Sequence, residues 1–431
     1  MSSHRWIRLF RSVARSRSFP AAACLAVAAG VAPAHAQGQA PHDSIVVSVL
    51  TMGPGQELFE RFGHQSIRIH DLTTGLDSAY NWGMFSFEQP HFLVRFLTGD
   101  TNYWMQGFPS DWLVSAYRDS GRAVWEQELS LTSTEKDSLW RFIKWNAREE
   151  NKWYRYDYYR DNCGTKVRDV LNMVLGGSLE RALAAHEHGV TYRSETLRLS
   201  RAYPLINFGM DFVLGRPADA TLSAWDEMFI PMRLQQLIRD IRVQHSDGSR
   251  GRLVLSERQL VVDQRYQDAD MPPEYFAPAL AVGVLIGGAL LALGTFCGNS
   301  VSARWWVGII GFAWNLLAGV TGLLLLCAEL FTRHAAYMGQ NVNVLLATPA
   351  SLALAVLFPL ALRGSASARL VRAARSLSIL AAACSVTTVL LRLVPALTQE
   401  NRPMLALAVP VQAALALALW RATGARRGAA L

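Results

Sequence analysis

Residues 155–174, RYDYYRDNCGTKVRDVLNMV, decide how the first half of this chain folds. Asp161 or Asn162 can cap a helix that begins there, because either side chain accepts hydrogen bonds from the free N–H groups of a first turn. The apolar residues that follow recur at helical spacing and are Val167, Val170, Leu171 and Val174. Gly176 and Gly177 then end the helix. The stretch therefore predicts an amphipathic helix with Cys163 at its start.

Cys163 lies at the edge of the apolar stripe, one turn before Val167. Free backbone N–H groups and the helix dipole favour an anion at that end. We therefore expect a thiolate whose pKa is lowered into the range of about 3.5–7.5 found at activated cysteines. The alternative is a small buried apolar residue, which would be expected deeper in the stripe.

The first 36 residues have the order of a secretory signal peptide: five arginines and no acid, an apolar run, then APAHA. Cys24 lies inside the apolar run rather than at its end, so we expect it to be removed and the mature chain to begin at Gln37. Exported cysteines usually pair. Because Cys163 is the only cysteine in residues 37–275, it is either a packing residue or a nucleophile.

Five apolar stretches follow residue 275, each long enough to cross a bilayer core of about 30 Å. They lie near 277–297, 305–327, 342–362, 376–397 and 403–420. If residues 37–275 are outside, the cytoplasmic segments hold eight arginines and the outer loops only Arg333 and Arg402. Short cytoplasmic loops collect basic residues, so we expect a cytoplasmic C-terminus.

The domains predicted are a signal peptide at 1–36, an exported catalytic domain at 37–270, a linker at 271–276, a membrane domain at 277–421 and a cytoplasmic tail at 422–431. The formal charge of +8 is misleading, because residues 37–275 hold 26 basic and 32 acidic residues. A mildly acidic exported domain argues against nucleic acid as a ligand.

Strands are expected at 44–52, 64–71, AYNWG and 123–131, where β-branched and aromatic residues gather. In HQSIRIHD (64–71), alternation places His64, Arg68 and His70 on one polar face that could line a cleft. His64 is the leading candidate for the base that a thiol nucleophile needs. The competing histidines are His70, His91, His186 and His188.

A metal site is the weaker hypothesis for these histidines. HEH at 186–188 lacks the spacing that puts two ligands on one helical face, and the chain has no CxxC. We therefore expect neither a metal nor a cofactor.

Two further segments bear on the fold. The aromatic segment 84–108 is too apolar for a simple solvent loop, and it is either core packing or a lipid-facing surface. Thr132 and Glu135 stand at capping-box spacing before an apolar periodicity, so a helix is expected to start there.

Several ordered motifs resemble one known family, the Lnb N-terminal periplasmic domain family. They are ERFGHQSIRI, YNWGMFSF, RYDYYRDNCGTKVRD, NFGMDFVLGRPAD and FIPMRL, and together they cover most of 43–245. The resemblance extends into the membrane part through FTRHAAYMGQNVNVLLATP.

This resemblance implies an α+β, circularly permuted papain-like fold, similar to lecithin:retinol acyltransferase and NlpC-type enzymes, followed by an all-α bundle of five transmembrane helices. It implies His64 as base and Cys163 as nucleophile. No third catalytic residue follows securely, and His70 and Asn81 are both candidates.

The activity implied is that of a membrane-bound lipoprotein N-acyltransferase of a bacterial inner membrane, with its catalytic domain in the periplasm. Cys163 would take an acyl chain from a phospholipid as a thioester and pass it to the N-terminal amine of a diacylated lipoprotein. The same resemblance, with the predicted topology, places His334, Asn341 and Asn343 on the side of Cys163, where contact with a head group or a lipoprotein is expected.

Two alternatives stay open. The same dyad would serve a membrane-tethered cysteine peptidase or amidase that acts on cell-wall peptides. A noncatalytic membrane module would use the domain for binding alone, and it would tolerate Cys163→Ser.

Overall fold

The computed structural model describes residues 44–263, 265–268 and 270–428, and side chains as far as residue 424. The predicted signal peptide, Cys24 and the predicted mature start at Gln37 lie outside these ranges. The described residues fall in one compact unit, residues 41–431. The predicted boundaries at 271–276 and 422 therefore stay predictions.

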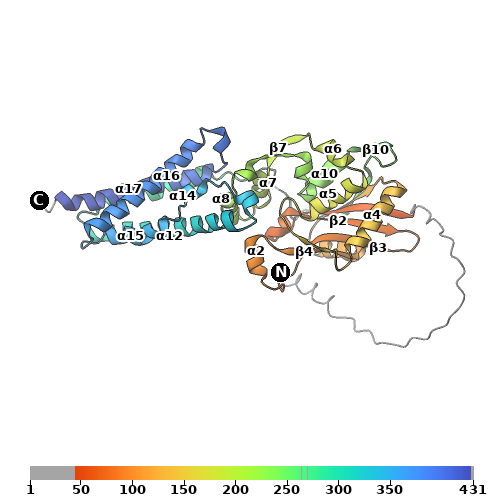
Figure 1. The fold of residues 1–431 in the computed structure, drawn as a ribbon, viewed down its shortest axis with the longest axis horizontal. Helices are drawn as coiled ribbons and strands as arrows, with labels where there is room; N and C mark the ends of the chain where they lie inside the picture. Colours follow the sequence, from red (N-terminus) through yellow and green to blue (C-terminus); the bar gives the residue numbers. More distant parts are fainter. Residues whose placement is uncertain (1–43, 264, 269, 429–431) are drawn as a thin grey trace, which may run out of the picture. The chain divides into compact units, whose positions relative to one another are not determined.

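The first part of the chain is α+β and is organised around one antiparallel sheet of seven strands in the order β11-β5-β1-β2-β3-β4-β6 (Figure 1). The strands are β1 (Ile45–Met52), β2 (His64–Asp71), β3 (Asp77–Met84), β4 (Asn102–Pro109), β5 (Val124–Leu129), β6 (Trp153–Arg155) and β11 (Val254–Val261). The four strands expected from the sequence are confirmed.

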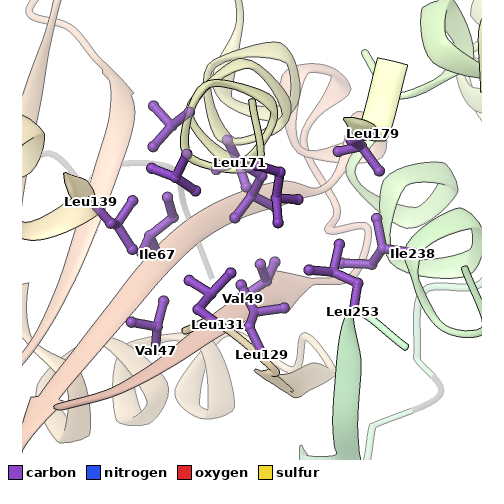
Figure 2. Packing of buried hydrophobic residues seen from close by; sticks show 14 of the residues in the cluster. Val47, Val49, Ile67, Leu129, Leu131, Leu139, Leu171, Leu179, Ile238 and Leu253 are labelled. Carbon is purple, nitrogen blue, oxygen red and sulfur yellow. The ribbon is translucent and has the colours of Figure 1, made fainter. Parts of the chain in front are cut away.

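Helices cover both faces of this sheet. Alternate residues of a strand point to opposite faces, and Val47 and Val49 of β1 pack under helices α4 (Ser133–Asn146) and α5 (Cys163–Val174). Figure 2 shows Leu139 of α4 and Leu171 of α5 over these strand residues. Leu50, on the other face, packs with helix α3 (Ser110–Asp119).

The two helices expected on the sheet begin where their caps predict. Thr132 and Glu135 form the capping box of α4. Asn162, rather than Asp161, caps α5, and Asp161 pairs with Lys166 at 2.6 Å instead. All four apolar stripe residues of α5 are buried.

The rest of the first part consists of short elements. They are η1 (Leu58–Phe62), α2 (Phe92–Thr98), α6 (Ser178–Leu183), β7 (Glu187–Thr191), α7 (Tyr192–Leu199), α8 (Pro204–Val213), η2 (Arg216–Asp219), β8 (Thr221–Ser223), α9 (Ala224–Glu227), α10 (Pro231–Ile238), β9 (Arg242–Gln244) and β10 (Arg250–Arg252). The aromatic segment 84–108 divides into α2, none of whose residues is buried, and β4, which joins the sheet.

Five helical segments of the second part are long and apolar enough to cross a membrane, as predicted. They are α11 (Phe276–Phe296), α12 (Val301–Phe331), Asn343–Ala361, α16 (Ala368–Leu391) and Arg402–Gly424 of α17 (Arg402–Gly428). Helix α12 lies alongside α15, and α16 alongside α17 (Figure 1). The segments between spans include α13 (Ala335–Met338) and η3 (Pro395–Leu397).

The third span is interrupted, a feature that its apolar composition did not predict. It consists of α14 (Asn343–Leu346) and α15 (Ser351–Ala361), with an irregular segment between them. Gly322 of α12 lies against that break, and a Cβ atom added there would be 1.4 Å from the carbonyl oxygen of Ala347. The glycine therefore permits the close approach of the two backbones.

Gly164 makes the corresponding close approach in the first part, and it supplies a test of the fold. A Cβ atom added to Gly164 would lie 2.7 Å from the oxygen of Met228 and 3.0 Å from that of Phe229. We expect Gly164→Ala to lower the free energy of unfolding by about 1–3 kcal/mol, because α5 or the facing backbone must move. Thermal unfolding of the full chain in detergent measures it.

Gly209→Ala in helix α8 is the matched control, because nothing lies within 4 Å of the Cβ position there. It should leave the stability unchanged or raise it by up to about 1 kcal/mol. Equal effects of the two substitutions would contradict the packing described for α5.

Candidate active site

Cys163 is the first residue of α5, and Asn162 fixes that end of the helix. The Asn162 side chain accepts a hydrogen bond from the N–H of Thr165 at 3.0 Å. Its amide nitrogen donates to the carbonyl oxygens of Tyr158 at 2.8 Å and Phe229 at 2.9 Å. One side chain thus caps the helix and ties it to two separate segments, so the position of Cys163 is closely determined.

The sulfur of Cys163 lies where strand β3 separates from β2. The register of the two strands ends at Ser66 and Asn81. The backbone N–H groups of Gln65, Gly164 and Cys163 itself lie near enough to the sulfur to lower the pKa of the thiol. One of these three groups belongs to the residue that follows His64.

His64 begins β2 and is oriented by Asn81 of β3. Its Nε2 lies 3.0 Å from the side-chain oxygen of Asn81. The amide nitrogen of Asn81 donates to the carbonyl of Ala79 at 3.0 Å, which settles that the oxygen faces the imidazole. Nε2 therefore carries the proton, and Nδ1 keeps the lone pair that a base needs.

The structure distinguishes the two candidates for the third residue. Asn81 is almost fully buried and bonds to His64. His70 stands six residues along the same strand, which is about 20 Å in extended chain. It lines a polar depression together with Arg68, Glu126 and Arg258. Asn81 is therefore the residue that orients the candidate base. The depression lined by Arg68 and His70 lies farther along β2, away from His64.

The remaining histidine candidates lie on other elements. His91 precedes α2 in a left-handed conformation, and Nδ1 of His188 lies 2.7 Å from a carboxylate oxygen of buried Glu227. Tyr117, from α3, stacks on the His64 ring at 6.4 Å between centroids.

The electrostatics of the pair differ from the sequence-based expectation. Burial and the nearby Arg122 lower the pKa of His64 to about 4, against a smaller upward effect of the bond to Asn81. Burial raises the pKa of the Cys163 thiol, although the three N–H donors and Arg122 oppose it. The expected low-pKa thiolate is therefore wrong for this state, because removal of solvent outweighs the helix N-terminus. Cys163 is therefore a neutral thiol and His64 a neutral imidazole.

Arg122 is a part of this site that the sequence did not reveal. Its side chain is buried, its Nε donates to the carbonyl of Gly53 at 2.9 Å, and its guanidinium lies 4.7 Å from the centroid of the Tyr117 ring. It is the cation that lowers both the His64 and the Cys163 pKa. No motif surrounds it in the sequence, so only the fold identifies it.

Tyr154 is the second residue that the sequence did not single out among neighbouring tyrosines. A Cβ atom added at Gly83 would lie 3.9 Å from Cβ of Cys163 and 4.0 Å from the Tyr154 hydroxyl oxygen. That hydroxyl is buried, and no group in the described ranges hydrogen-bonds to it. Burial raises the pKa of Tyr154, so the phenol stays protonated. A hydroxyl group that has no hydrogen-bond partner among the described residues thus lies near Cys163.

The three residues predicted to contact substrate have other partners. Asn341 and Asn343 are buried and donate to the carbonyl oxygen of Phe212 at 3.1 and 2.8 Å. Their amides hold the loop to helix α8, which is a structural role, and their contact with substrate stays a prediction. The Nε2 of His334 donates to the carbonyl of Phe96 at 3.0 Å, and its ring stacks on Tyr158.

Alkylation tests the protonation state of Cys163. Because its pKa is raised above the ordinary value of 9.0, iodoacetamide should modify it faster at each step of pH up to 9 and beyond. The rate is measured by mass spectrometry of the peptide that contains Cys163, in a variant with Cys297, Cys327 and Cys384 replaced by alanine. A plateau reached at neutral pH would show a thiolate–imidazolium pair and contradict the neutral one.

Comparison with known proteins gives one result for this region. Residues 32–198 match the model of the Lnb N-terminal periplasmic domain family. No curated protein and no solved structure matched the chain. The matched range contains His64, Asn81, Tyr154 and Cys163, so the segment that carries the candidate site is similar to the Lnb N-terminal periplasmic domain family.

Proposed function

We propose that the protein is a membrane-bound thiol acyltransferase that moves an acyl chain from a phospholipid, through a thioester on Cys163, to the N-terminal amine of a diacylated lipoprotein. The observation that supports it is the arrangement of Cys163, His64 and Asn81 in a periplasmic domain that continues into five apolar helices. Both substrates are lipids, so a catalytic domain held at the bilayer meets them at high effective concentration.

In the first step, the Cys163 sulfur attacks the ester carbonyl carbon of the phospholipid. Nδ1 of His64 takes the thiol proton as the S–C bond forms, because the neutral thiol is a poor nucleophile by itself. The C–O bond then breaks, the leaving alkoxide receives the proton from His64, and a lysophospholipid departs. The acyl group remains on the sulfur as a thioester.

In the second step, the lipoprotein amine attacks the thioester carbon. The N–C bond forms, the C–S bond breaks, and His64 passes the amine proton to the sulfur. Asn81 holds the imidazole in the tautomer that serves both steps. A base with a pKa of about 4 is unprotonated throughout the neutral range, so it is ready to accept a proton in each step.

Negative charge develops on the carbonyl oxygen in both steps, and the site has donors for it. The Tyr154 hydroxyl and the backbone N–H groups around the sulfur are the candidates. Such donors stabilise the tetrahedral intermediate most where water is excluded.

The proposal includes the fold and the location that the family resemblance implies. The strand that carries His64 precedes the helix that carries Cys163, which is the order of a circularly permuted papain-like domain. Eight arginines at or beyond the ends of the spans on one side, against Arg333, Arg392 and Arg402 on the other, support a cytoplasmic C-terminus in the inner membrane.

The direct test expresses the full chain in bacteria depleted of their own lipoprotein N-acyltransferase, followed by mass spectrometry of lipoprotein N-termini. The wild type should produce N-acylated lipoproteins, and Cys163→Ser should leave the amine free at equal expression. Free amines in cells that express the wild type well would refute the transferase. Cleavage of cell-wall peptides by the same protein would then support the peptidase or amidase alternative.

Tyr154→Phe tests the oxyanion donor. We expect thioester formation on Cys163 to slow by about 10²-fold, the usual effect of removing one such donor. Stability should be unchanged or higher, because the hydroxyl has no partner to lose. Tyr158→Phe is the control, since it removes a hydroxyl from a partly exposed ring of the same segment. A normal rate for Tyr154→Phe would rule the donor out.

A further inference from the structure

Helix α2 has its polar and apolar faces reversed relative to a helix that meets water. Phe92, Arg95 and Thr98, spaced three residues apart, are the half-buried residues of α2. The side chains most exposed are apolar and are Leu93 (67%), Val94 (60%), Phe96 (42%) and Leu97 (60%). A surface helix in water shows the opposite pattern.

Helix α8 has the same reversal. Its buried residues are the polar Asn207 and Asp211. Asn207 donates to the carbonyl of Leu197 at 2.6 Å, and Asp211 pairs with Arg193 at 2.8 Å. Leu205 is 85% exposed and Ile206 45% exposed. Two separate helices of the periplasmic domain therefore direct polar groups inward and large apolar groups outward.

Both helices contact the ends of the membrane spans. The span α12 ends at Phe331, which is 76% exposed, and two residues later the N–H of Arg333 donates to the carbonyl of Thr98 at 3.0 Å. Phe208 of α8 pairs with Tyr275, the N-cap residue of α11, at 5.9 Å between ring centroids. The apolar surface of the spans thus continues onto α2 and α8.

From this continuity we infer that α2 and α8 together form a platform that rests in the bilayer leaflet on the side of the periplasmic domain, with Val94 and Leu205 among the side chains in contact with lipid. The occupant is the lipid surface, because the exposed residues adjoin helices that are themselves surrounded by lipid. Burial of such side chains at an interface stabilises the contact in proportion to their apolar area.

A series of aromatic contacts leads from this platform to the nucleophile. Phe92 of α2 stacks on Phe85 at 6.2 Å, Phe85 on Tyr103 at 5.2 Å, and Tyr103 on Tyr156 at 4.2 Å. Tyr103 also pairs in register with Tyr154, and the Tyr154 hydroxyl and Cβ of Cys163 lie 4.0 and 3.9 Å from the Cβ position of Gly83. This series gives α2 a role in the proposed function, as the place where a phospholipid acyl chain leaves the leaflet for Cys163.

The depth of single labels tests the platform. Spin labels are attached at Val94→Cys, Leu205→Cys and Leu72→Cys in a chain whose other cysteines are replaced by serine or alanine, and the protein is placed in phosphatidylethanolamine–phosphatidylglycerol nanodiscs. Leu72 is the matched control, because it is 61% exposed in a turn beside Thr73 and Thr74. The electron spin relaxation of each label is measured with oxygen, which concentrates in lipid, and with a water-soluble nickel chelate. The two collision rates of each label are then compared.

Labels at 94 and 205 should collide preferentially with oxygen, and the label at 72 with the nickel chelate. A label at 94 or at 205 that collides preferentially with the nickel chelate overturns the platform. That result is expected if those helices instead bind another protein. The outcome does not depend on catalysis, so it stands apart from the test of the transferase.

A second measurement covers the role of α2 in acyl transfer. Thioester formation on Cys163 is compared between vesicle phospholipid and a soluble short-chain thioester. Val94→Asp should lower the ratio of the two rates by about tenfold, which corresponds to ~1.4 kcal/mol, and Leu72→Asp should leave it unchanged. An unchanged ratio for Val94→Asp would overturn the entry role. Absence of any thioester in the wild type would count against the proposed function. It would not change what the spin-label depths show about the platform.

Discussion

The site depends on the contacts that fix the first turn of helix α5. Asn162 closes the first turn through Thr165 and at the same time bonds to the backbone of Phe229, while Gly164 lets that backbone approach to within contact distance. These contacts place the Cys163 sulfur where strands β2 and β3 separate. Backbone N–H groups of the first turn of α5 and of Gln65 then lie close to the sulfur and lower its pKa. Strand pairing and helix capping together create the site.

The neutral states of Cys163 and His64 follow from the same packing, which buries both side chains. Helix N-termini favour a thiolate, but here the sulfur and the imidazole lie among many protein atoms, and a buried ion pair has a large desolvation cost. Arg122 adds a positive charge that disfavours protonation of His64 and partly offsets the burial of Cys163. In the function proposed above, the thiolate would form only as the sulfur attacks a carbonyl carbon.

Much of this architecture could be predicted, because local patterns determine it. The strand at 64–71 and the helix at Cys163 were identifiable from alternation, capping and spacing. Arg122 and Tyr154 were not, because their roles come from contacts between segments distant in sequence. The pKa of Cys163 was wrongly predicted for a related reason: a sequence shows the helix terminus but not how much solvent is removed around it.

Arg193 links these parts in a way that affects biogenesis. Its buried guanidinium joins Asp211 and Asp219, and Asp219 also accepts a hydrogen bond from the N–H of Glu400, directly before the last span. Gln399 donates to the carbonyl of Leu214 at 3.1 Å. The periplasmic domain thus completes its hydrogen bonds with residues that leave the ribosome nearly two hundred positions later. The hydrogen bonds of Asp219 and Leu214 to this segment can form only after Gln399 and Glu400 have been synthesised, and a fragment without the helices would lack these partners.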